Sequence, residues 1–281
     1  MPITNMVINP PENITQIELA PEHKRGLTLT SPFIAESGCW GFVDEYSKII
    51  KMRLLGAMIT NPISVYPRNP SRSVQIREVS PGIALHTGLP NPGIRQALLT
   101  FGKKWSNFAC PIIVNLAVDN PDEVNECIYQ LEEQDNVLGI EIGLQHHDDP
   151  NHAAAIVANA ARGSLPIIVK IPFENQETFA RLAQDSGAQA ITVTAPARTT
   201  LPHKSTWFEG RLYGANTFGI ILTLVRKLSQ TIRLPIIAAG DVHNIEQAHT
   251  LLEAGAKAVQ LGSIVWVQPS RINLILKSWQ H

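Results

Sequence analysis

Residues 235–263, PIIAAGDVHNIEQAHTLLEAGAKAVQLGS, decide the fold class. The apolar runs 236–239 and 258–261 do not alternate with polar residues, and turn formers bound each of them, as is typical of strands buried on both faces. Between them, Asn244 can cap a helix with Gln247 at its third position, and Gly255 can end that helix in the left-handed conformation. The stretch therefore predicts two neighbouring parallel strands joined by a helix.

Two glycine turns follow these strands. Gly240-Asp241 and Gly262-Ser263 leave the carboxyl ends of the two strands, where a missing side chain lets backbone N–H groups approach a ligand. In an eightfold β/α barrel, the loops after strands 7 and 8 are the recurrent phosphate site. Either pair alone could be no more than a tight turn, but two pairs on adjacent strand ends favour a phosphate site.

Composition restricts the class of protein. The chain has 281 residues and a net charge of -1, so nothing in its charge favours nucleic acid or a membrane surface as a partner. It has no apolar run near the ~20 residues of a membrane span, and residues 1–16 do not resemble a signal peptide. We expect a cytoplasmic protein, a homodimer, that acts on small molecules. Cys39, Cys110 and Cys127 lack metal-ligand spacing, so we expect reduced thiols and no metal.

Strand and helix candidates alternate along the rest of the chain. Residues 1–26 are expected to form an N-terminal arm, and 27–281 a single (β/α)8 TIM barrel with long loops at its carboxyl-end face. A doubly wound sheet alternates in the same way, but eight units that end in paired glycine turns favour closure. The segments 61–93 and 196–214 are too long for plain connections and should cover the barrel mouth. The predicted strands are 33–35, 56–60, 111–117, 137–144, 166–172, 190–195, 236–239 and 258–261, and the predicted helices include 43–54, 216–228 and 270–279.

Several motifs in order give the chain a resemblance to a known family. They are FIAESGCWG (33–41), GAMITN (56–61), YPRNPSR (66–72) running on to GLPNPG (88–93), PIIVNLA (111–117), IEIGLQHHDDP (140–150), PIIVKIP (166–172), GRLYGA (210–215), PIIAAGDV (235–242) and AVQLGS (258–263). Together they resemble the dihydroorotate dehydrogenase family, class 1-like, over roughly residues 27–268. The resemblance implies an FMN-dependent β/α barrel that works as an oxidoreductase.

The resemblance also implies a cofactor site. Lys170 matches a lysine at the end of strand 5, where a fixed cation near the flavin N1 and C2=O stabilises the anionic reduced ring. The alternative is a lysine that extends its ammonium from an apolar strand to solvent. The other matched cofactor positions are Ser37, Thr60, Asn115, Gly214, Gly240, Asp241, Gly262 and Ser263. Asp241 departs from the family's usual glycine, and its carboxylate would repel a phosphate unless it points away.

The substrate face departs from the family pattern. Asn61 replaces a lysine, Leu85, Gly143 and Asp148 replace asparagines, and the asparagine after strand 6 falls on Thr194 or Ala195. Each lost amide leaves a substrate edge unpaired at a cost of ~1–3 kcal/mol. We therefore expect a small anionic substrate that differs from dihydroorotate. Two alternatives remain open: an altered flavin- or phosphate-binding barrel that serves as a scaffold or partner subunit, and a non-flavin barrel that acts on a phosphorylated ligand.

His146 stands where the family has its cysteine or serine base. An imidazole with a pKa near ~6.5 is a competent general base at neutral pH, so His146 could accept the substrate proton. It could instead be an ordinary loop residue, or form a metal site with His147, Asp148 and His152. The expected roofing loops also carry basic residues, which could bind an anionic substrate or could simply be charges exposed to solvent. They are Arg68, Arg72, His86, His203, Lys204 and Arg211.

Overall fold

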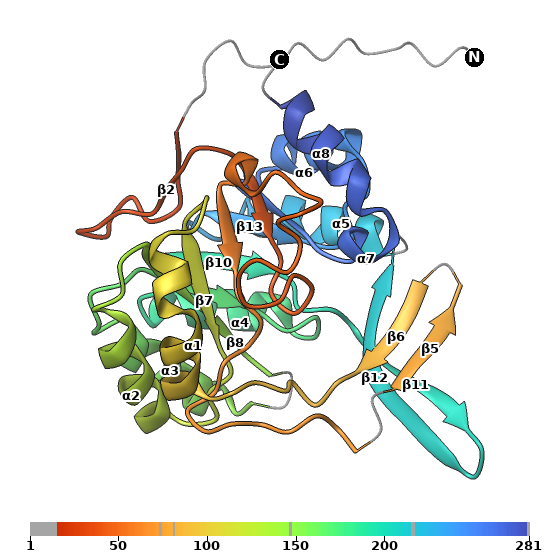
Figure 1. Ribbon diagram of the computed structural model, residues 1–281, viewed down its shortest axis with the longest axis horizontal. Coiled ribbons are helices and arrows are strands. Elements are labelled where there is room, and N and C mark those ends of the chain that lie inside the picture. Colours follow the sequence, from red (N-terminus) through yellow and green to blue (C-terminus); the bar gives the residue numbers. More distant parts are fainter. Residues whose placement is uncertain (1–15, 73–74, 81, 146–147, 215–216, 280–281) are drawn as a thin grey trace.

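Eight parallel strands close into a barrel in the computed structural model, which describes residues 16–72, 75–80, 82–145, 148–214 and 217–279 (Figure 1). All eight strand positions predicted from the sequence are confirmed, and so is the (β/α)8 TIM-barrel class. The barrel runs in the order β3 (Phe33–Ala35), β4 (Ala57–Ile59), β7 (Ile112–Leu116), β8 (Val137–Gly143), β9 (Ile167–Lys170), β10 (Ala190–Val193), β13 (Ile236–Ala239) and β14 (Ala258–Leu261), and then returns to β3.

The last two strands show why the glycine turns meet at one end. Ala238 of β13 pairs with Val259 of β14 and with Val193 of β10, and Leu261 of β14 pairs with Ala35 of β3. Every residue of β13 and β14 is buried, as expected for strands covered on both faces. Because all eight strands are parallel, the segments that follow them open at the same rim of the barrel.

Helices cover the outside of the barrel. They are α1 (Ile94–Ser106), α2 (Pro121–Leu131), α3 (Pro150–Ala160), α4 (Gln176–Asp185), α5 (Phe218–Leu228), α6 (Ile245–Glu253), α7 (Ile264–Val267) and α8 (Pro269–Ser278). The expected cap of α6 is confirmed, because Asn244 Oδ1 accepts a hydrogen bond from the Gln247 N–H at 2.8 Å, and Gly255 follows the helix with a φ of +115°.

The helix predicted over 43–54 is wrong. This segment consists of turns and a single 3-10 turn, η1 (Met52–Leu54). The Glu45 carboxylate accepts hydrogen bonds from the N–H groups of Phe42 and Val43, and Asn273 of α8 bonds both Lys51 N and Ile49 O. The two Asn273 bonds use the Lys51 N–H and the Ile49 carbonyl, which a helix over 43–54 would have paired internally, so the segment follows the surface of α8 instead.

The two long segments are not plain loops, because each contains a hairpin. One hairpin is β5 (Gln75–Val79) with β6 (Gly82–His86), and the other is β11 (Arg198–His203) with β12 (Thr206–Gly214). β12 pairs with β6 through partners such as Leu212 and Ala84, which joins both hairpins into a four-stranded antiparallel sheet beside the barrel (Figure 1). The sequence patterns did not predict this sheet.

A short antiparallel hairpin closes the opposite end of the barrel. β1 (Ile17–Glu18) pairs with β2 (Thr28–Leu29), and the Glu18 carboxylate accepts hydrogen bonds from Ala20 N, Leu27 N and Thr28 Oγ1. Leu19, Leu27 and Leu29 pack in an apolar cluster with inward-facing residues of the barrel strands. The other members of this cluster are Ala20, Ile34, Ala57, Ile59, Ile113, Ile168, Ala190, Ile237 and Ala258.

The cysteines are buried free thiols. Burial raises the pKa of Cys110 and Cys127 to about 12, so both remain protonated at neutral pH. Within the described ranges, no three His, Cys, Asp or Glu side chains are grouped as a metal ion would need. Nor is any described helix both long and apolar enough to cross a bilayer.

Candidate active site

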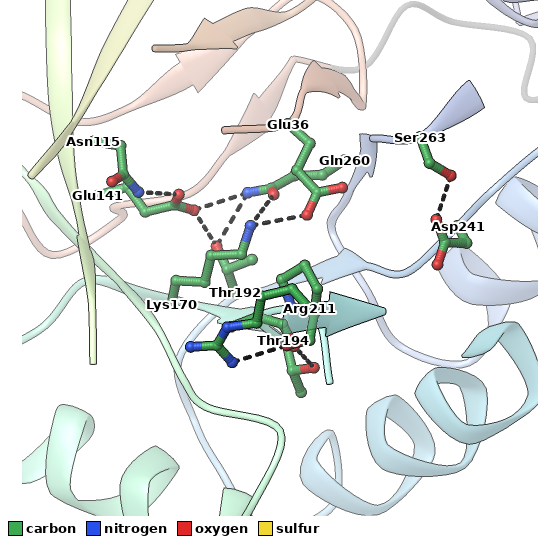
Figure 2. Close-up of polar contacts among 12 residues, drawn as sticks. Glu36, Asn115, Glu141, Lys170, Thr192, Thr194, Arg211, Asp241, Gln260 and Ser263 are labelled. Atoms are coloured by element: carbon green, nitrogen blue, oxygen red, sulfur yellow. Dashed lines mark hydrogen bonds and ion pairs between the residues drawn. The ribbon is translucent and has the colours of Figure 1, made fainter. Parts of the chain in front are cut away.

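A buried ion pair lies at the carboxyl end of the barrel. Lys170 is the last residue of β9, and its Nζ donates to Glu36 Oε1 at 2.9 Å and to Gln260 Oε1 at 3.3 Å (Figure 2). Glu36 directly follows β3 and Gln260 belongs to β14, so three strands contribute to this contact. The ammonium is 6% exposed and the carboxylate 5%, which leaves each charge dependent on the other for stabilisation.

A second carboxylate extends the network across the barrel interior. Glu141 of β8 is fully buried and accepts hydrogen bonds from Asn115 Nδ2 at 2.8 Å, Thr192 Oγ1 at 2.7 Å and Gln260 Nε2 at 2.8 Å. Since Gln260 also accepts from Lys170, its amide joins the two carboxylates into one hydrogen-bonded system (Figure 2). Buried charge is tolerated where it is hydrogen-bonded in this way.

Burial and charge move the two pKa values at this ion pair. Burial disfavours the ammonium, but the carboxylates of Glu36 and Glu141 outweigh it and raise the pKa of Lys170, which therefore stays charged. Burial raises the pKa of Glu36, and Asp241 and Glu141 add to this effect, whereas Lys170 opposes it. The pKa of Glu36 therefore lies above its ordinary value in spite of the neighbouring ammonium.

The two glycine turns are cross-linked by Asp241. This residue has a φ of +43°, and its carboxylate accepts from Ser263 Oγ at 2.5 Å and from Thr217 Oγ1 at 2.8 Å. His243 Nε2 lies 3.2 Å from the same Ser263 hydroxyl. The Asp241 side chain thus ties together the segments that follow β12, β13 and β14.

Gly240 and Gly262 have no room for a side chain. A Cβ at Gly240 would lie 2.3 Å from Ile221 of α5, and one at Gly262 would lie 1.9 Å from Glu36 Oε2. Among the described residues, no backbone carbonyl accepts a hydrogen bond from the N–H of Asp241 or Ser263. The two turns therefore have backbone N–H donors without a described carbonyl acceptor, at positions where an added Cβ would collide with Ile221 or Glu36.

A small pocket opens beside these turns, with a cavity volume of about 20 Å³, far below the ~300–1,000 Å³ typical of small-molecule sites. β12 covers one side of it with Leu212 and Tyr213, which confirms that the 196–214 segment reaches the barrel mouth. Its other lining residues are Glu36, Phe173, Thr194, Ala195, Pro196, Ala197, Thr217, Ile221, Ala239, Gly240 and Asp241.

The remaining residues expected to bind a cofactor are distributed around this network. Ser37 is buried, and its Oγ has no hydrogen-bond partner among the described residues. Thr60 Oγ1 accepts from the Asn115 N–H at 3.2 Å, and Gly214 is the last residue of β12. His146, the expected base, lies outside the described residues, as does His147.

The substrate-face positions have specific contacts. Asn61 Oδ1 accepts from Gly41 N and so links the segments that follow β4 and β3, whereas Asp148 Oδ2 accepts from Gln145 N within a local turn. A Cβ at Gly143 would have nothing within 4 Å, which shows open space where the family has an asparagine. Leu85 lies on β6 opposite Arg211, whose guanidinium donates to Pro196 O and Gln145 Oε1.

Comparison with known proteins now identifies the family. The sequence profile of dihydroorotate dehydrogenase matches residues 22–279, nearly the whole chain. The chain belongs to the dihydroorotate dehydrogenase family. Among its relatives is the dihydroorotate dehydrogenase B (NAD(+)) catalytic subunit of Bacillus pumilus, which is 28% identical over 267 residues, or 87% of this chain and 85% of the relative. The catalytic subunit of the same name from Streptococcus pneumoniae is 29% identical over 270 residues, or 87% and 86% of the two chains.

A solved structure of the family confirms the fold. The crystal structure of DHODH from Eimeria tenella in complex with ferulenol superposes with a TM-score of 0.75, at 16% identity over 93% of this chain and 82% of that chain. At this identity the likeness is evidence for the barrel alone.

The family's FMN can be tested against these residues. Three features fit: the buried Lys170 ammonium, the unpartnered Ser37 hydroxyl, and glycine turns whose N–H donors are not used by described carbonyls. Two features oppose: the cavity is only about 20 Å³, and Glu36 Oε2 lies against the position of a Gly262 Cβ, although a carboxylate is the free end of a flexible side chain. The backbone of the site therefore fits an FMN, provided that Glu36 changes its rotamer.

Sequence reasoning missed five polar residues of this site, namely Glu36, Glu141, Thr192, Thr217 and Gln260. Three of them stand within otherwise apolar barrel strands, as in VLGIEIG and AVQL, and a lone polar residue inside a buried strand was the available signal. Glu36 and Thr217 lie in connections, where a polar residue is ordinary. Only the fold shows that Glu36 and Thr217 line the same cavity.

Proposed function

We propose that this protein is an FMN-dependent oxidoreductase that acts on a small anionic substrate other than dihydroorotate. The observation that carries the proposal is the buried Lys170 ammonium at the carboxyl end of β9, next to the glycine turns that follow β13 and β14. Bound FMN would supply the hydride acceptor for this chemistry. The protein residues would bind the cofactor, position the substrate and remove its proton.

Each residue has a role in this proposal. Lys170 supplies positive charge beside the flavin ring, and Ser37 offers its unpartnered hydroxyl. The N–H groups of Asp241 and Ser263 would hold the phosphate, with the Asp241 carboxylate directed toward Ser263 and Thr217 hydroxyls. Arg211 lies on the roofing strand β12, where its guanidinium favours an anion, and His146 accepts the substrate proton.

One specific observation favours a second candidate, an altered barrel that serves as a scaffold or partner subunit. Glu36 fills the space between Lys170 and Gly262, and the pocket beside it is small. The visible spectrum of the purified protein tests whether flavin is bound, because bound oxidised flavin absorbs near ~450 nm. Reduction of that flavin by a small anionic substrate, rather than the colour itself, separates the flavoenzyme from a flavin-binding scaffold. A colourless protein that takes up no added FMN contradicts the flavoenzyme proposal.

The Gly262→Val variant tests the placement of the phosphate. We expect it to lose most of the FMN that the parent protein retains, since the added side chain fills the space in which the N–H donors must approach the phosphate. The measurement is the ratio of flavin to protein absorbance after gel filtration. Gly143→Val is the matched control, because a Cβ there meets no atom within 4 Å. Equal flavin content in parent and Gly262→Val would show that the phosphate is bound elsewhere.

Dihydroorotate itself is expected to reduce the bound flavin slowly or not at all. Two of the missing amides, those at Gly143 and Leu85, already correspond to ~2–6 kcal/mol of lost transition-state binding, or roughly one to four orders of magnitude in rate. Anaerobic stopped-flow measurement of flavin bleaching gives this rate directly. Gly143→Asn, which places an amide in open space, should increase it. Rapid bleaching of the parent protein would mean that these amides are not needed.

A further inference from the structure

The side chain of Glu36 spans the two places that the proposed function assigns to the cofactor. Its Oε1 accepts the Lys170 ammonium at 2.9 Å, and its Oε2 lies 1.9 Å from where a Cβ of Gly262 would be. A flavin whose ring contacts Lys170 and whose phosphate contacts the Gly262 turn must pass through this position. The carboxylate and the cofactor therefore compete for the same space.

Charge opposes the cofactor as well. The charged groups that face Glu36 are Lys170 on β9, Glu141 on β8 and Asp241 after β13, and the Cys39 thiol and Tyr213 hydroxyl lie in the same environment. With Glu36 itself included, one ammonium therefore lies among three carboxyls. A phosphate adds further negative charge at short range, in a region where solvent screens little.

We propose that Glu36 sets the cofactor affinity of this protein, since in the free state it takes the flavin's place as the counter-ion of Lys170 and must rotate away for a flavin to bind. The inference rests on the proposed function. Glu36 acts here through space and charge, as a determinant of binding. The backbone turns need not move, because only the end of a flexible side chain stands in the way.

Fluorescence titration of FMN into flavin-free protein tests this inference. Glu36→Ala should bind FMN about tenfold more tightly than the parent or better, because it removes both the volume and the charge of the carboxylate. Glu36→Gln keeps the volume and an acceptor for Lys170 while it removes the charge, so its affinity should fall between the two. Glu209→Ala is the control, because it removes a carboxylate from β12 whose side chain is 65% exposed, and its affinity should match that of the parent.

The outcomes separate the inference from the proposed function. Tighter binding by Glu36→Ala than by the parent supports the inference, and it cannot result from a poorly folded variant. Parent protein that binds no FMN while Glu36→Ala does supports the inference and contradicts the flavoenzyme proposal. The inference is overturned if the parent and Glu36→Ala bind FMN with equal affinity, or if neither protein binds FMN. If both proteins bind FMN with equal affinity, the flavoenzyme proposal survives.

Discussion

Replacing Lys170 by methionine is expected to lower the free energy of unfolding by about 3–5 kcal/mol, the usual effect of removing one partner from a buried ion pair. Methionine keeps much of the volume, so the loss reports chiefly the uncompensated charge of Glu36, whose carboxylate is 5% exposed. Chemical denaturation of flavin-free protein at neutral pH measures the change. A loss below about 1 kcal/mol would show that the pair is unimportant for stability.

The same variant has a defined pH dependence. Without Lys170, nothing opposes the burial that raises the folded-state pKa of Glu36 above its ordinary 4.5. The folded protein then keeps a proton that the unfolded chain releases, so stability falls as the pH rises from about 4.5 to the raised folded value and is level above it. The double variant Glu36→Ala/Lys170→Met removes both charges and should regain part of the stability without this pH dependence.

Replacing His146 by alanine is expected to lower the rate of flavin reduction by about 10²-fold or more, the usual contribution of a positioned general base. The plot of rate against pH should also lose its ascending limb, because that limb reports deprotonation of the imidazole. The measurement is anaerobic flavin bleaching at a saturating concentration of dihydroorotate, slow as this reaction is expected to be.

The control for this variant is His147→Ala, which alters the neighbouring imidazole. His146 is supported as the base if His146→Ala changes both the rate and the pH profile and His147→Ala changes neither. If His147→Ala produces the loss and His146→Ala does not, the base is the neighbouring histidine. If neither changes the profile, proton removal does not depend on either histidine.

The barrel itself could be predicted from the sequence because its signals are local. Short apolar runs ended by turn formers marked each strand, and side chains close in sequence, such as Asn244, marked helix starts. The helix predicted over 43–54 failed because its backbone is bonded by Asn273, more than 200 residues away. The sheet of β5, β6, β11 and β12 failed for the same reason, since β6 and β12 pair across more than 100 residues.

The site, like the fold, could be predicted from the sequence only in part. The glycine turns could be named as candidates from their place after two adjacent strands, and Lys170 from the family resemblance. The relation of Lys170 to Glu36 could not, because it depends on how β3 and β9 are placed across a closed barrel. A glutamate after a strand is ordinary in sequence, and its significance arises only from the ammonium and the glycine that it meets.

The hairpin of β1 and β2 has a consequence for synthesis of the chain. Its leucines precede every barrel strand in the chain and are buried against residues from strands as late as β14, so they leave the ribosome before those strands and find their last partners only after β14 has been made. Until then Leu19, Leu27 and Leu29 remain an exposed apolar surface, which is the kind of surface that favours aggregation of nascent chains. Contacts of such long sequence separation also make closure of this end a slow step in folding. Chaperone dependence during translation should therefore concentrate at residues 17–29 rather than at the rim that carries Lys170.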